Sequence, residues 1–251
     1  MTTAKRNNSI LSKWFIGLFL SISNISPSIA DELKLQTFDG NYSLYIAGLH
    51  VGHSKLSLSQ SGDLWRWQTS SKPCGVYRWL SDKKPYFETR FSLNAGRHLI
   101  QNILISDEVD KNLYETEHFN WPNKQVNIFR KKVTSIASIS GDVYDYHSIN
   151  WLIANMISAG KTELEVNFYL KGAVIKSIVR RIDNKNIDTA GQKVSAWVYE
   201  QTTANSSSKL LYYFNPAQPL LPFKIEKFKP GKKTTILLLK ISIPALNIKL
   251  S

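Results

Sequence analysis

The chain has 251 residues, 43% of them hydrophobic, and a formal net charge of +13 from 32 basic and 19 acidic residues. This length suits one domain or two small ones with ample core. Its single cysteine, Cys74, excludes an internal disulfide, so the core must hold itself together without a covalent bridge.

Residues 1–30 have the order of a secretory signal peptide. The first thirteen positions carry three basic residues and no acid, an apolar run follows from Trp14 to Leu20, and Ser28-Ile29-Ala30 supplies the small residues before a cleavage site. The pattern predicts cleavage after Ala30 and export to the periplasm. An uncleaved membrane anchor is the alternative, but the apolar run is shorter than the ~20 residues that span a bilayer. Cleavage would remove three basic residues and no acidic one, which leaves residues 31–251 with a charge of +10.

Short runs rich in Val, Ile, Leu, Phe, Tyr and Trp recur after residue 40, with Gly, Pro, Asn, Asp and Ser between them, and predict consecutive antiparallel strands. Several runs alternate apolar and polar residues, as in 163–170, which predicts one buried and one solvated face. A turn is expected at Asn184-Lys185-Asn186 and a hairpin loop at 202–208. The expected strands lie near 42–48, 51–60, 63–70, 85–94, 97–106, 112–119, 125–132, 162–171, 173–182, 193–202, 208–214, 221–229 and 233–242.

One segment has a helical period instead, with apolar residues at i, i+3, i+4, i+7 and i+8: Ile149, Leu152, Ile153, Met156 and Ile157. Ser148 is expected to cap this helix, with Asp145 just upstream, and Gly160 to end it. About eleven residues are marginal as an isolated helix, so the apolar stripe must lie on a sheet. The prediction is therefore a mostly β fold in a single domain, 31–251. It is a large curved antiparallel sheet, open or closed and barrel-like, with one amphipathic helix between its two halves.

Three places in the chain occur in the order found in one family. They are Tyr45-Ile46-Ala47-Gly48-Leu49-His50-Val51-Gly52, Asp145-Tyr146-His147-Ser148 before the apolar helix, and Leu220-Leu221-Pro222-Phe223-Lys224-Ile225-Glu226. The chain resembles the bacterial exported family catalogued as domain of unknown function 3108 over roughly 40–240. The resemblance implies a periplasmic protein whose curved sheet wraps a helix, similar in outline to the half-barrels of periplasmic lipoprotein and lipid carriers. It implies no catalytic residues.

Two polar groupings could carry chemistry. His50 and His53 have a spacing that shares a metal on a helix, but on a strand the two side chains face opposite ways, and neither a nearby cysteine nor a third histidine completes a site. We therefore expect exposed turn residues and no metal, with Cys74 as a buried inert thiol or, alternatively, in an intermolecular disulfide. Asp145, His147 and Ser148 suggest a hydrolase triad, yet neighbours at a helix start rarely converge, and capping is the simpler interpretation.

Two groups of acidic residues could act as acid and base. We expect the first, Asp107, Glu108 and Asp110, to lie in a solvated turn, and Glu115 and Glu117 to lie on a solvated strand face. Nucleotide, phosphate-loop and dithiol motifs do not occur in the sequence. We therefore expect neither a cofactor nor catalytic residues.

The aromatic residues are candidates either for the core or for the lining of an apolar cavity, and the cavity candidates are Trp65, Trp67, Trp151, Trp197 and Tyr199. Basic runs either form a solvated face or attract polyanions, and the rim candidates are Arg130, Lys131, Lys132, Arg180 and Arg181. In a cell envelope the anionic partners would be lipid headgroups, lipopolysaccharide or wall polymers, and the compartment excludes nucleic acid.

These observations favour a non-enzymatic periplasmic protein that binds a hydrophobic or amphipathic, lipid-like envelope component. One alternative is a structural or partner-binding envelope protein without a cavity, which would recruit a partner by adding a strand to a sheet edge. A hydrolase that acts on wall or lipid is the least favoured interpretation.

Overall fold

One sheet of fifteen strands dominates the structure. The computed structural model describes residues 35–80, 82–94, 96–110, 112–189, 192–204 and 206–242, all within the compact unit formed by residues 31–251. Two helices, α1 (Tyr77–Leu80) and α2 (Ser148–Ser158), interrupt the strands. The strands are β1 (Phe38–Ile46), β2 (Leu49–Ser61), β3 (Leu64–Pro73), β4 (Pro85–Asn94), β5 (Arg97–Asp107), β6 (Tyr114–Asn120), β7 (Gln125–Arg130), β8 (Val133–Ser138), β9 (Val143–Tyr144), β10 (Glu163–Leu170), β11 (Ala173–Thr189), β12 (Gln192–Thr203), β13 (Lys209–Phe214), β14 (Pro222–Lys229) and β15 (Lys232–Ser242).

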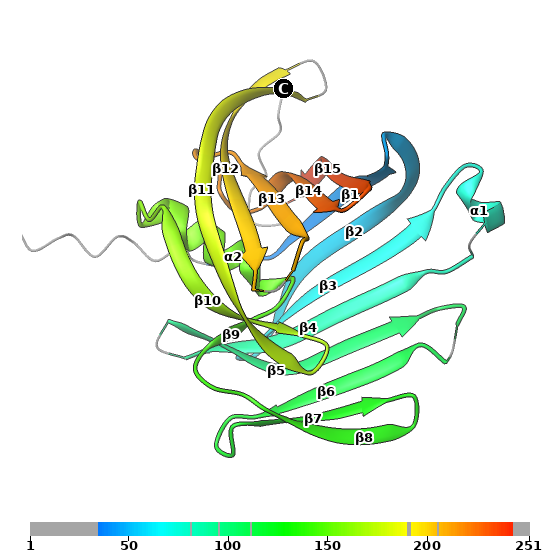
Figure 1. Cartoon of the computed structure of the whole chain (residues 1–251), viewed down its shortest axis with the longest axis vertical. Coiled ribbons are helices and arrows are strands. Elements are labelled where there is room, and N and C mark those ends of the chain that lie inside the picture. Colours follow the sequence, from blue (N-terminus) through cyan, green and yellow to red (C-terminus); the bar gives the residue numbers. More distant parts are fainter. Residues whose placement is uncertain are drawn as a thin grey trace, which may run out of the picture. The chain divides into compact units, whose positions relative to one another are not determined.

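The strands form two runs, β1 to β8 and β9 to β15, which meet where β1 pairs with β15. The order is β8-β7-β6-β5-β4-β3-β2-β1-β15-β14-β13-β12-β11-β10-β9. Apart from the pairing of β1 with β15, every pairing joins two consecutive strands of the chain (Figure 1). All pairings are antiparallel except that of β9 with β10. In the described chain, β8 and β9 are the outer strands and do not pair, so hydrogen bonds do not close the sheet. The predicted fold class is confirmed.

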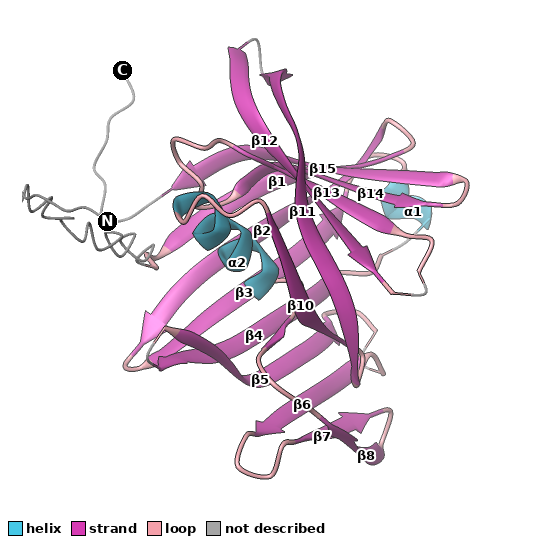
Figure 2. Ribbon diagram, turned by 60° about the vertical axis from the view of Figure 1, so that its left-hand side comes forward, coloured by secondary structure: helices cyan, strands magenta, loops and turns pink. Residues whose placement is uncertain are grey.

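Helix α2 packs against strands of both runs (Figure 2). Ile149, Ile153 and Met156 lie in one cluster with side chains of β10 to β13. Trp151 lies in a second cluster, with Phe38, Trp67 and other side chains of β1 to β4. Because one short helix contacts β1 to β4, in the middle of the strand order, as well as β10 to β13, near one end of it, the sheet must curl around the helix.

Strand β10 has the predicted solvated face at Glu163 and Glu165, but at Phe168 and Tyr169 both of its faces are buried. Phe168 packs with α2 in the first cluster. Tyr169, on the opposite face, packs against Phe119 with ring centroids 5.0 Å apart, in a cluster formed mainly by β5, β6 and β7. The end of the last strand run therefore folds over the first run, and β10 lies between α2 and strands β5 to β7.

The two ends of α2 are fixed by different devices. At the N-terminus, Asp145 Oδ1 accepts the backbone N–H of Ser148 at 2.8 Å and of His147 at 3.2 Å, and the Ser148 hydroxyl at 2.6 Å. The cap is thus supplied by Asp145 and not, as expected, by Ser148, which is the first helical residue. At the C-terminus, Gly160 has φ +65°, and Lys161 N donates to Met156 O at 2.8 Å. This is a Schellman stop, which confirms the predicted role of Gly160.

All thirteen predicted strands are present, but three local features differ. Strands β8 and β9 were not predicted, because β8 is mostly exposed and lacks alternation, and β9 has two residues. Lys131 and Lys132 both have positive φ and form the β7–β8 turn inside the predicted strand 125–132. Residues 184–186 pair with 195–197 inside β11, so the expected turn there is wrong.

The expected signal peptide and its cleavage site lie outside the described residues. Within the described part of the chain, neither helix is long and apolar enough to cross a membrane.

We predict that Asp145→Ala lowers the free energy of unfolding by roughly 2–4 kcal/mol. The substitution removes the helix cap and leaves the buried hydroxyl of Thr89, which donates to Asp145 Oδ2, without its acceptor. Urea unfolding followed by circular dichroism measures the change. Asp63→Ala, in the exposed β2–β3 turn, is the control and should change stability by less than about 0.5 kcal/mol. Equal effects of the two substitutions would contradict this role of Asp145.

Candidate functional site

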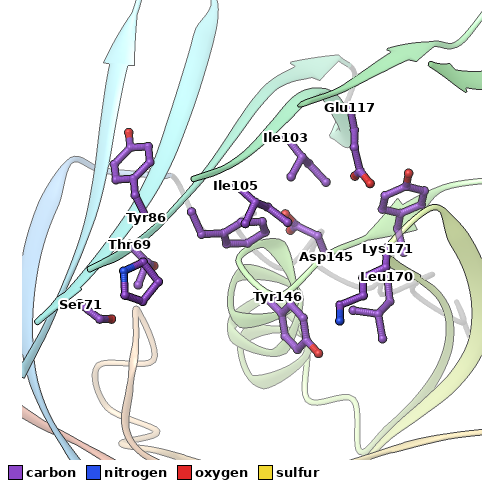
Figure 3. Close-up of a pocket in the computed structure, with 13 residues that line it drawn as sticks. Thr69, Ser71, Tyr86, Ile103, Ile105, Glu117, Asp145, Tyr146, Leu170 and Lys171 are labelled. Carbon is purple, nitrogen blue, oxygen red and sulfur yellow. The ribbon is translucent and has the colours of Figure 1, made fainter. Parts of the chain in front are cut away.

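An apolar pocket of about 260 Å³ lies where the two strand runs face each other. One wall comes from β3, β4, β5 and β6, and includes Phe87, Ile103 and Ile105. The other wall comes from the segment before α2 and the end of β10, and includes Tyr146 and Leu170 (Figure 3). The pocket therefore occupies a part of the inner sheet face that α2 does not cover.

The acidic pair on β6 faces this interior, not solvent as expected. Glu115 and Glu117 are both buried, and Glu117 lines the pocket. Arg130 on β7 donates from Nε to Glu115 Oε2 at 2.6 Å and lies 3.7 Å from Glu117. Burial raises the pKa of Glu117 to about 8, reinforced by the hydrogen bond that its protonated form donates to Glu115 and by the charge of Glu115. Glu117 is therefore mainly protonated at pH 7.

Two polar atoms at the pocket interact with each other but form no well-aligned hydrogen bond with the described residues. They are Oε1 of Glu117 and the hydroxyl of Tyr169, and both are buried. A buried polar atom without a partner costs roughly 1–3 kcal/mol. A polar group of a ligand in the pocket would recover that loss.

Cationic side chains lie at the second wall. Lys171, directly after β10, lines the pocket. The Lys227 ammonium lies 5.7 Å from the ring centroid of Tyr146, another lining residue. Burial first, and then the charges of Lys229 and Lys171, lower the pKa of Lys227. Mutual repulsion between these lysines favours an anion beside them.

The geometry of Asp145, His147 and Ser148 positions α2 and does not assemble a hydrolase triad. His147 Nε2 lies 2.7 Å from Thr69 Oγ1, and its Nδ1 lies 3.0 Å from Thr89 Oγ1. The hydroxyl of Ser148 instead donates to Asp145, so the base does not contact the nucleophile. Burial lowers the pKa of His147 to about 4 and keeps the ring neutral. These hydrogen bonds tie the start of α2 to β3 and β4.

None of the five predicted cavity residues lines this pocket. Trp67 and Trp151 are buried in one core cluster, with Trp65 packed against it. Tyr199 is buried in the other cluster, with Trp197 packed against it. The aromatic side chains thus occupy the core, which was the alternative interpretation.

The five predicted rim residues lie in two separate places. Arg130 is paired with Glu115, and the exposed Lys131 and Lys132 follow it in the β7–β8 turn. Arg180 pairs with Glu200, and the Arg181 guanidinium lies 4.5 Å above the Trp197 ring. Arg180 lies opposite Glu163, at the far end of β10 from Lys171. Lys171 and Lys227 were not among the rim candidates. Lys171 is a single lysine at a turn, and Lys227 lies in a basic run, 224–233, that does not itself indicate which lysine faces the interior.

The expectations for His50, His53 and Cys74 were wrong in two respects. First, β2 contains a bulge: Val51 has no partner on β1 between the paired residues Tyr45–His50 and Leu44–Gly52. This bulge reverses the alternation and brings the two imidazole rings together, with centroids 4.8 Å apart. Second, Cys74 is part-exposed, and its Sγ lies 3.5 Å from His50 Nδ1. A third metal-binding side chain therefore adjoins the pair.

The fold and this pocket define a class: a barrel-like, open antiparallel β-domain wrapped around one helix. The chain belongs to the family described as "Protein of unknown function (DUF3108)", whose model matches residues 41–237. It is similar in structure to a Brucella abortus protein described as a beta-barrel-like protein of domain of unknown function DUF1849. The TM-score is 0.57 at 10% sequence identity, over 85% of this chain and 100% of the other. No curated protein matches the sequence.

We predict that Glu117→Gln removes a pH-dependent loss of stability. The pKa of Glu117 is raised to about 8 in the folded state from an ordinary value near 4.5. Between about pH 4.5 and 8, the folded chain therefore binds a proton at Glu117 that the unfolded chain has released. The free energy of unfolding consequently declines as the pH rises through this range. The Gln variant should match the natural protein at pH 5 and exceed its unfolding midpoint at pH 9. A difference that is the same at both pH values would show that Glu117 does not titrate in this way.

Proposed function

We propose that this protein binds a small amphipathic anion in the pocket between β3–β6 and the start of α2, without catalysis. The observation that carries the proposal is the combination of an apolar pocket of about 260 Å³ with a lysine in its lining. Apolar walls with a few placed polar groups are typical of small-molecule sites.

The pocket size restricts the ligand. An apolar cavity of ~150 Å³ in another protein holds benzene, so a pocket of about 260 Å³ has room for an aromatic ring or part of an acyl chain. Each buried methylene contributes about 0.8 kcal/mol. A phospholipid would enter with part of one chain only, whereas a small amphipathic molecule would be held more completely.

The polar groups define the two ends of the ligand. Lys171 and Lys227 beside Tyr146 favour an anionic head, each cation contributing on the order of 1 kcal/mol. The Oε1 atom of Glu117 and the hydroxyl of Tyr169, which are buried without a well-aligned hydrogen bond, are suited to a neutral hydroxyl or carbonyl. Together these groups favour a lipid-like anion with a second polar group over a pure hydrocarbon.

A second candidate function is partner binding by strand addition at β8. Among the described strands β8 pairs only with β7, and it exposes Val133 and Ile136 to 65% and 63%. Unpaired edges with apolar side chains recruit strands from other chains. A protein that co-purifies in stoichiometric amount while the pocket stays empty would favour this function over ligand binding.

We propose that binding takes place in the periplasm, because residues 1–30 have the charge and apolar pattern of a signal peptide. N-terminal sequencing of protein isolated from the cell envelope should begin at Asp31. Retention of Met1 would contradict cleavage and export by this route.

Filling the pocket should abolish binding of an amphipathic probe. Anilinonaphthalene sulfonate combines apolar rings with an anion, and its fluorescence rises in apolar surroundings. We expect Ile105→Trp to weaken its affinity by more than about tenfold, because the indole occupies the space of the ligand. Lys171→Gln should weaken the affinity about fivefold, as expected for the loss of ~1 kcal/mol.

The matched controls are Leu104→Trp, on the opposite face of β5, and Lys193→Gln, an exposed lysine on β12. Both should leave the affinity unchanged. Trp65→Ala should lower stability without changing the affinity, because Trp65 packs against the core cluster of β1 to β4. Equal losses in Ile105→Trp and Leu104→Trp would show that the probe binds elsewhere.

A further inference from the structure

Three side chains with metal-binding atoms meet on the surface, away from the pocket. His50 and His53 come from β2, and Cys74 directly follows β3. Their ligand atoms all lie within 4.8 Å of one another. Both histidines are exposed and Cys74 is part-exposed, so an ion from solvent can reach all three. None of the three residues lines the pocket.

The backbone builds this cluster through the bulge in β2. In a regular strand, residues three apart point to opposite faces, and one bulged residue restores them to the same face. The bulged residue, Val51, turns its carbonyl toward the next strand, where it accepts the backbone N–H of Cys74 at 3.0 Å. This backbone hydrogen bond places Cys74 beside the histidines.

Two neighbouring residues keep the cluster in place. Gly52 lies so close to β3 that an added Cβ would meet Lys72 O at 2.5 Å, so a glycine is needed for this approach. The ring of Tyr45, opposite His50, lies 5.2 Å from the His50 ring and limits its motion. Lys72, opposite His53, and Arg78, which donates to Pro73 O next to Cys74, are unfavourable charges nearby, but both are exposed and therefore screened.

We propose that His50, His53 and Cys74 bind a d¹⁰ transition-metal ion, Zn²⁺ or Cu⁺, with the thiolate and two imidazole nitrogens as ligands. Sulfur and imidazole donors select these ions and disfavour Mg²⁺ and Ca²⁺, which require oxygen ligands. With metal–sulfur and metal–nitrogen bonds of ~2.3 and ~2.0 Å, tetrahedral geometry places the two donors ~3.5 Å apart. The 3.5 Å between Cys74 Sγ and His50 Nδ1 matches that separation. A fourth position would remain open to water or to a ligand.

Metal titration of the reduced, metal-free protein tests this proposal. Zn²⁺, and Cu⁺ without oxygen, would be titrated against a chromophoric chelator, and Co²⁺ would serve as a spectroscopic probe. We expect one equivalent of Zn²⁺ or Cu⁺ to bind, and a thiolate-to-cobalt charge-transfer band with Co²⁺. Cys74→Ser should abolish the band, and His50→Gln and His53→Gln should each weaken affinity by more than about tenfold.

His118→Gln is the control, because His118 is an exposed strand histidine that contacts Asn102 outside the cluster. It should leave the band and the affinity unchanged. If Cys74→Ser fails to fold, reversible blocking of the thiol in the natural protein replaces it. Stoichiometric binding that survives loss of the thiol would overturn the proposal, as would failure of Zn²⁺ and Cu⁺ to slow alkylation of Cys74. The second outcome would leave the cysteine and His50 as a simple hydrogen-bonded pair.

Discussion

One short helix packs inside a sheet of fifteen strands, and this packing determines how the sheet curls. Helix α2 has 11 residues and is therefore only about 16 Å long. The inner faces of fifteen strands offer far more apolar surface than it can cover. The sheet curls so that β10 packs over β5 to β7 and buries Tyr169 against Phe119. Asp145, bonded to Thr89 of β4, fixes where the helix begins. The pocket is the part of the inner face that neither α2 nor β10 fills.

Local periodicity was sufficient to predict most elements of this fold. Short apolar-rich runs between turn residues, several of them alternating, marked thirteen strands, and five apolar residues from Ile149 to Ile157 marked α2. Both patterns arise from side-chain geometry within one element, so they need no knowledge of its neighbours. The bulge at Val51 is a register shift in the pairing of β2 with β1, and the burial of both faces at the end of β10 depends on β5 to β7, which are distant in sequence. These two features decide the cluster of His50, His53 and Cys74 and the pocket, so neither was predictable from periodicity.

The charged residues show the same limit of prediction from sequence patterns. A net charge of +13 predicted basic surfaces, but Arg130 and Arg180 are paired with glutamates of neighbouring strands. Glu226, in one of the motifs of the family resemblance, is buried between Lys224 and Lys233, at 2.8 and 2.9 Å. Which cations remain for a ligand is thus decided by register, and register is set by the buried face as a whole. The lysine that lines the pocket, Lys171, is distinguished only by its position after β10.

Native mass spectrometry of protein purified from its own cell envelope is a direct test of ligand binding in the pocket. We expect that the natural chain carries a small anionic, lipid-like molecule and that the Ile105→Trp variant, purified identically, does not. A natural chain at its bare polypeptide mass, or the same adduct on both proteins, would contradict this expectation. In that case the space beside α2 would be a packing defect of a curled sheet and not a binding site.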